Sequence, residues 1–106
     1  MIITTSDEIP GKKIVRTLGL ARGNTVRSRH IGVDLMAFLR NIVGGEVTGY
    51  TKMLAEAREQ SLDRMVAEAE AMGANAIVTL RFTANSIIGS TAELLAYGTA
   101  VVIKDE

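Results

Sequence analysis

The stretch Thr48–Leu80, TGYTKMLAEAREQSLDRMVAEAEAMGANAIVTL, predicts one long helix, a glycine stop and a strand that comes straight back. Small and apolar residues recur there at three- and four-residue steps, which is the spacing of one helix face. The members of this face are Leu54, Ala57, Ser61, Leu62, Met65, Ala69 and Met72. Gly73 would end the helix, and Ala76–Thr83 then alternates as a strand does. The alternation predicts that Val78, Leu80 and Phe82 lie on one face of that strand.

Two strands joined by a hairpin are predicted before this stretch. Ile2–Thr5 is short and β-prone, and Lys13–Arg22 reads as the first arm of the hairpin. Gly23–Asn24 is expected to be its turn, because both residues tolerate positive φ, with Thr25–Arg29 as the returning arm. Gly19 inside the first arm indicates a bulge or a close approach of the backbone.

A short amphipathic helix is predicted over Val33–Val43, with Gly44 at its C-cap. A long final strand, bent at Gly98, is predicted over Thr91–Lys104. Strands that flank two helices indicate an α+β class. We expect residues 1–106 to form a single domain, with a small, largely antiparallel sheet and one short and one long helix on one face.

The final strand also predicts self-association. Its apolar part, Ala100–Ile103, carries few charges, and proteins rarely leave such an edge unpaired. We therefore expect a homo-oligomer in which a second copy covers this edge.

Composition excludes several functional classes. The chain of 106 residues has no cysteine, so thiolate zinc sites, iron–sulfur clusters and cysteine nucleophiles are ruled out. The formal net charge is zero, which does not fit a nucleic-acid-binding protein. No apolar run is long enough to span a bilayer, and residues 1–10 do not resemble a signal peptide, so a cytoplasmic protein without a membrane partner is expected.

Arg27, Arg29 and His30 form the best candidate for anion binding. They precede the predicted short helix, whose free amides could help to hold an anion, and Gly32 would let a ligand approach the backbone. No phosphate-binding glycine loop supports this interpretation. The alternative, which we favour, is that these arginines form salt bridges between subunits with the acidic long helix.

Other residues give weaker hypotheses. Tyr50 could lie in a ligand pocket, although packing beside a tight glycine turn explains it as well. His30, the one histidine, could chelate a metal with Asp34, but a loop histidine with no ligand is the simpler interpretation. No catalytic residues are assigned, and no G-x-S-x-G elbow supports a hydrolase.

Taken together, these segments strongly resemble the YbjQ family of small bacterial and archaeal proteins of unknown function. The resemblance rests on Thr4, Thr5, Pro10, Gly11, VRSRHIGVD at 26–34, RNIVGGE at 40–46, Tyr50, EAR at 56–58, GANAIV at 73–78 and YGTAVVI at 97–103. It implies a subunit of a ring, expected to be a homopentamer, and a heavy-metal-binding label that travels with the family. Many members carry acidic residues on the strand after GANA, whereas Thr79–Thr83 has none.

Three functions follow as hypotheses. The first is a ring-forming scaffold or small-ligand binding module without chemistry of its own. The second is a protein that binds a heavy metal or another divalent metal ion. The lack of cysteine argues against a soft site in one subunit, but a ring could gather copies of Glu46 or Glu93 into an oxygen-rich site. The third is an enzyme acting on an anionic metabolite at Arg27, Arg29 and His30.

Overall fold

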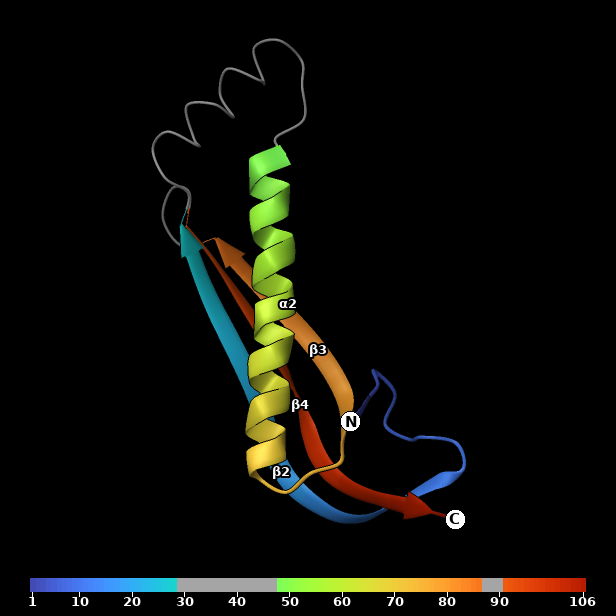
Figure 1. Cartoon of the computed structure of the whole chain (residues 1–106). Helices are drawn as coiled ribbons and strands as arrows, with labels where there is room; N and C mark the ends of the chain where they lie inside the picture. Colours follow the sequence, from blue (N-terminus) through green and yellow to red (C-terminus); the bar gives the residue numbers. More distant parts are fainter. Residues whose placement is uncertain (29–47, 87–90) are drawn as a thin grey trace.

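A mixed four-stranded sheet with one long helix on its face forms the fold (Figure 1). A computed structural model describes residues 1–28, 48–86 and 91–106. The strand order is β1-β3-β4-β2; β1 pairs with β3 in parallel, and the other pairs are antiparallel. The elements are β1 (Ile2–Ile3), β2 (Lys12–Ser28), α2 (Thr48–Ala71), β3 (Ala76–Ser86) and β4 (Thr91–Asp105). The predicted α+β class is confirmed, while the short helix predicted over 33–43 lies outside the described residues.

Helix α2 forms as its spacing predicts. Ala57, Ser61, Met65 and Ala69 are buried, and they share the face that packs on the sheet. At the C-terminal end, Gly73 has a φ of +90°. The amide of Gly73 donates to the carbonyl of Glu70, and the amide of Ala74 donates to the carbonyl of Ala69. These two bonds make a Schellman cap, which needs the left-handed backbone that glycine adopts most easily.

The predicted hairpin at Gly23–Asn24 is wrong. Strand β2 runs without a turn from Lys12 to Ser28, and its whole length pairs with β4. Its buried residues, Ala21, Gly23 and Thr25, are small, and they lie under α2. Because the helix packs close to the strand, glycine serves here to avoid a clash with α2 rather than to make a turn.

Strand β3 contains a bulge that the alternating pattern did not predict. The register shifts between Val78 and Arg81, and Thr79 has a φ of +57°. One extra residue reverses the direction of every side chain beyond it. Accordingly, Leu80 packs with the core under α2, while Val78 belongs to a second core on the other face. The prediction that these two residues share a face is therefore wrong.

The first residues of the chain hold the lower part of the sheet together. The amides of Thr79 and Leu80 donate to the carbonyls of Ser6 and Thr4. Ile9 packs against the second core, whose buried members are Ala76, Val78, Val101 and Ile103. Gly19 does mark an irregularity, because the β2–β4 register shifts between Thr17 and Gly19.

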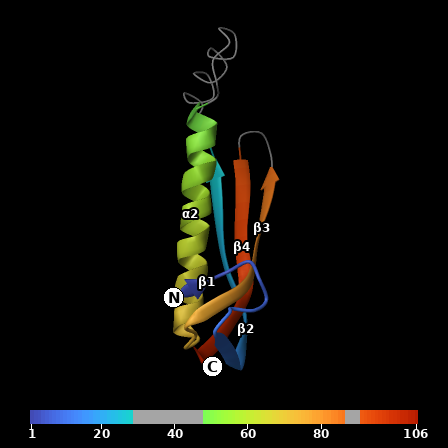
Figure 2. The ribbon, with the colours of Figure 1, turned by 90° about the vertical axis from the view of Figure 1, so that its right-hand side faces the viewer.

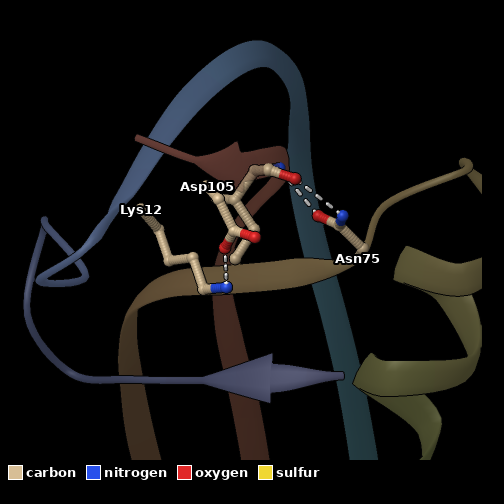
Figure 3. Close-up of polar contacts among 4 residues, drawn as sticks. Lys12, Asn75 and Asp105 are labelled. Atoms are coloured by element: carbon tan, nitrogen blue, oxygen red, sulfur yellow. Dashed lines mark hydrogen bonds and ion pairs between the residues drawn. The ribbon is translucent and has the colours of Figure 1, made fainter.

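Two side-chain contacts fasten the C-terminal end of β4 (Figure 3). The Asn75 amide nitrogen donates to the Ile103 carbonyl over 2.9 Å, and the Ile103 backbone amide donates to the Asn75 oxygen over 2.7 Å. Lys12 forms an ion pair with Asp105. The two contacts join the turn after α2 and the start of β2 to the same strand.

The edges of the sheet differ from the prediction. Strand β4 is central: Ala100 and Val101 pair with both β2 and β3, and Ile103 pairs with β2 and is bonded by the Asn75 side chain, so this stretch is not an edge that a second copy must cover. Within residues 1–28, 48–86 and 91–106, one edge of the sheet is instead the outer side of β2, and the other is formed by the two-residue β1 and by residues 81–86 of β3 beyond it. The reason is topological: β3, which directly precedes β4 in the chain, pairs on one side of β4, and β2, from much earlier in the chain, pairs on the other.

Helix α2 covers only one face of the sheet, over β2 and β4 (Figures 1 and 2). Figure 2 shows the helix on one side and the N-terminal segment crossing the lower part of the other side. Among the described segments, no helix is long and apolar enough to cross a membrane.

Candidate functional site

On the side of the sheet opposite α2, no helix of the described residues covers the half that holds residues 81–86 of β3, and we call this surface the open face. Cross-strand pairing decides which residues it holds, because directly opposed residues point to the same side of a sheet. In β2 the buried residues, which lie under α2, alternate with exposed ones, so the exposed residues lie on the open face. The members are Leu20, Arg22, Asn24 and Val26 of β2, Glu93, Leu95, Tyr97 and Thr99 of β4, and Arg81, Thr83 and Asn85 of β3.

A shallow hollow of about 370 Å³ lies on this face, lined by Arg22, Asn24, Glu93 and Leu95. It offers a guanidinium, an amide and a carboxylate beside an apolar side chain. Neither Arg22 nor Glu93 has an ion-pair partner among the residues that the structure describes. The hollow is therefore suited chemically to a small polar molecule that carries both donors and acceptors.

An aromatic ring sits between two arginines next to this hollow. Tyr97 on the central strand is opposite Arg22 on one side and Arg81 on the other. The Arg81 guanidinium donates to the carbonyls of Thr5 and Leu80, over 2.9 and 2.8 Å. The Arg81 side chain is thus held by the N-terminal segment, whereas the Arg22 guanidinium makes no hydrogen bond to another described residue, so Arg22 is the more available of the two for a ligand.

Arg27, a residue of the predicted anion site, interacts with the helix. One guanidinium nitrogen donates to the Gln60 side chain over 2.7 Å, and the other lies 4.0 Å from a Glu56 carboxylate oxygen. Arg27 thus pairs with the acidic helix of its own chain, and the preferred alternative of salt bridges between subunits stays a prediction. Arg29 and His30 lie outside the described residues, so the anion site as a whole stays a prediction.

The other candidates are only partly located. Tyr50 belongs to the first turn of α2, but its side chain is not among those that the structure describes. Glu46 lies outside the described residues. Glu93 is half-buried on the open face, opposite Asn85. Three or more metal-binding side chains do not come together anywhere in the described ranges.

The donor set does not suit a soft heavy metal within one subunit. The chain has no cysteine, and Met65, the most buried of the described methionines, is enclosed in the core. Soft metals favour thiolate and thioether ligands, and a binding site needs several of them together. We therefore derive no chemistry from such a metal.

The buried hydroxyl of Ser61 has a structural role. Its Oγ lies 3.0 Å from Thr25 Oγ1, 2.8 Å from the Ala57 carbonyl oxygen and 3.1 Å from the Leu94 carbonyl oxygen. Ser61 is fully buried, and these neighbours satisfy it in an otherwise apolar interface between α2 and the sheet. It ties the helix to β2 and β4 rather than acting as a nucleophile.

Sequence reasoning missed the hollow and the row of Arg22, Tyr97 and Arg81. A signal was present in residues 20–26, LARGNTV, where small residues alternate with larger ones. Such a pattern is typical of a strand that packs one face on a close helix and exposes the other. Because glycine is common in turns, the sequence pattern indicates a hairpin turn at Gly23 and predicts that the strand ends there.

Comparisons with known proteins find sequence relatives over nearly the whole chain. The model of a family named YbjQ_1, described as "Putative heavy-metal-binding", matches residues 1–104. A UPF0145 protein of Methanosarcina acetivorans is 55% identical over 103 residues, covering 97% of each chain. A UPF0145 protein of Pyrococcus abyssi is 56% identical over 106 residues, covering 100% of this chain and 93% of its own. Another, from Clostridioides difficile, is 51% identical and covers 100% and 95%.

One solved structure has a similar fold. It is a protein of unknown function from Pediococcus pentosaceus, of the DUF74 family, with a TM-score of 0.63. The two share 15% sequence identity, and the match covers 98% of each chain. At this identity the likeness concerns the fold alone.

Proposed function

This chain belongs to the YbjQ_1 family, and from that premise we propose that it is a subunit of a ring-forming homo-oligomer, a scaffold or small-ligand binding module with no chemistry of its own. The observation that carries the proposal is the pair of open sheet edges. The outer side of β2 and residues 81–86 of β3 have no neighbouring strand within the described ranges. Long unpaired edges invite pairing with another chain.

The two edges suit a ring better than an isolated pair of chains. They are the two opposite edges of one sheet, so the β2 edge of one copy can contact the β3 edge of the next, and this contact can repeat from copy to copy. Repetition of such a head-to-tail contact closes into a ring when the rotation fits. Five copies is the ring size that the family resemblance implies, and the proposal carries it as an expectation.

The hollow supports the binding part of the proposal. Arg22, Asn24 and Glu93 supply polar groups on a face that α2 leaves free. A small polar ligand is the class that this lining fits.

Native mass spectrometry beside the denatured mass tests the proposal. A closed oligomer is expected, and excess mass per ring would reveal a ligand retained from the cell. A protein that stays monomeric at micromolar concentration contradicts the ring. Arg22→Ala together with Asn24→Ala should remove the excess mass without changing the number of subunits, because a strand edge pairs through its backbone groups, which both substitutions keep.

Binding of a hard divalent cation is the second candidate function. Glu93 favours it, because this half-buried carboxylate has no ion-pair partner in the described part and faces Asn85 across β3 and β4. Carboxylate and amide oxygens are ligands of Ca²⁺ and Mg²⁺, and a ring would multiply them. Equilibrium dialysis with Ca²⁺, Mg²⁺ and Zn²⁺ tests this function. Retention that Glu93→Gln abolishes would support it, and no retention of any of the three ions would reject it.

A further inference from the structure

We infer that the open edge of β2 in one copy pairs, in parallel, with residues 81–86 of β3 in the next copy. This inference rests on the proposed homo-oligomer and specifies its contact. It makes the four-stranded sheet of one subunit continuous with the sheet of its neighbour. The partner is a second copy of this chain.

Strand direction decides that the pairing is parallel. Both β2 and β3 run antiparallel to β4, so these two outer strands point the same way (Figure 1). Rotation about an axis along the strands preserves their direction, and β2 of one copy therefore meets β3 of the next in parallel. The same step can be repeated around the axis, so each copy offers its β2 edge to one neighbour and residues 81–86 of β3 to the other.

Self-pairing of β2 with β2 is disfavoured by charge. The strand carries five basic residues and no carboxylate: Lys12, Lys13, Arg16, Arg22 and Arg27. Two copies paired with each other would bring like charges together, which destabilises a sheet. Strand β3 carries only Arg81. The unlike pairing therefore avoids most of this repulsion, and it also covers the edge of β3.

The N-terminal segment limits where the neighbour can bind. It pairs with Ala76 and Ile77 through β1, and its carbonyls bind the amides of Thr79 and Leu80. The free part of the β3 edge begins after this point, at Arg81. A neighbouring β2 must therefore pair with the upper half of β3.

Phe82 provides independent support. It pairs with Ala96, so it lies on the same sheet face as α2, yet it is 40% exposed because α2 lies over β2 and β4. Beyond Arg81, where β1 no longer takes part, each subunit contributes the three strands β2, β4 and β3. Three strands place the helices of successive copies about 14 Å apart along the sheet. Packed helices are about 8–10 Å apart, which leaves a gap of about 4–6 Å between them. An aromatic side chain at Phe82 would fill this gap and be buried by the helix of the next copy.

Disulfide cross-linking tests the contact directly, because the natural chain has no cysteine that could interfere. Thr83→Cys on β3 is combined in turn with Arg22→Cys, Asn24→Cys or Val26→Cys on β2. All four positions are exposed and lie on the open face, so the variants should fold. After oxidation, at least one double variant should give a ladder of linked chains that ends at the subunit number found by native mass spectrometry.

Matched controls make each result decisive. The single variants should give no covalent dimer, and Thr83→Cys with Glu68→Cys, an exposed pair on different layers, should give no ladder. A dimer formed by Asn24→Cys alone would show pairing of β2 with β2 and overturn the inference. An intact closed oligomer without any ladder would overturn it too, while leaving the proposed function standing. A monomer would instead contradict the proposed function itself.

Discussion

Gly23 of β2 and Ser61 of α2 are in direct backbone contact: a Cβ atom at position 23 would lie 2.3 Å from the Ser61 carbonyl oxygen. The same atom would lie 2.4 Å from the Met65 amide nitrogen. Both neighbours are backbone atoms of a long helix, so neither can move aside cheaply. This contact sets the distance between the helix and the sheet.

We expect Gly23→Ala to lower the free energy of unfolding by about 3 kcal/mol, the upper end of the usual cost of overpacking. Urea denaturation at fixed protein concentration measures this loss. Asn24→Ala is the matched control, because its side chain is exposed, and it should change stability by less than about 0.5 kcal/mol. Equal denaturation midpoints for the two variants would show that the helix can shift at no cost.

Thr79→Gly should stabilise the protein. A β-branched residue at a φ of +57° is strained, by about 1–3 kcal/mol, and glycine removes that strain. The greater freedom of glycine in the unfolded chain offsets part of the gain, so we expect a net increase of about 1 kcal/mol. Thr83→Gly, on the same strand, should lower stability instead, since glycine weakens an ordinary strand position. Thermal unfolding of both variants should show shifts of opposite sign.

Asn75→Ala should loosen the end of β4. The change removes two hydrogen bonds to the backbone of Ile103, and because Asn75 is partly accessible to water we expect a loss of about 1–2 kcal/mol. Amide hydrogen exchange gives a local readout: the Ile103 N–H should exchange faster in the variant. Asn75→Asp keeps an acceptor for that N–H and should protect it better than alanine does. Unchanged exchange at Ile103 would contradict this role.

The ion pair of Lys12 and Asp105 predicts a small dependence of stability on pH. The hydrogen bond from Lys12, with its positive charge, holds the pKa of Asp105 below its ordinary value of 3.8. A carboxylate with a lowered pKa stabilises the fold above its ordinary pKa, and this contribution is lost as the pH falls through the lowered value. Both groups are at the surface, so the effect should be small and should weaken in salt.

An NMR titration of the Asp105 carboxyl carbon checks this expectation. In Lys12→Gln the pKa of Asp105 should rise toward 3.8, and high salt should shrink the difference from the natural protein. Lys13→Gln removes the neighbouring charge without touching the pair, and it should leave the titration nearly unchanged. If Lys12→Gln and Lys13→Gln shift the titration equally, general surface charge rather than the ion pair sets the pKa.

The sequence predicted the parts that depend on local periodicity and punctuation. The spacing of Ala57, Ser61, Met65 and Ala69 gave the buried face of α2, and Gly73 gave its end. Both features follow from contacts within a few residues along the chain, so residue spacing alone specifies them. The motifs quoted from the sequence also identified the family, because they occur in order along the chain.

The tertiary structure decided what depends on residues far apart in the chain. Only the neighbouring helix shows why Gly23 lies within a strand rather than in a turn. The bulge at Thr79 reverses the faces of Val78 and Leu80, and the pairing of β4 with both β2 and β3 places it at the centre of the sheet. The open face arises in the same way, since α2 packs along β2 and β4 on one side of the sheet and the N-terminal segment covers only part of the opposite side. Glycine and short apolar runs fit several backbone environments, and only packing between distant segments selects one.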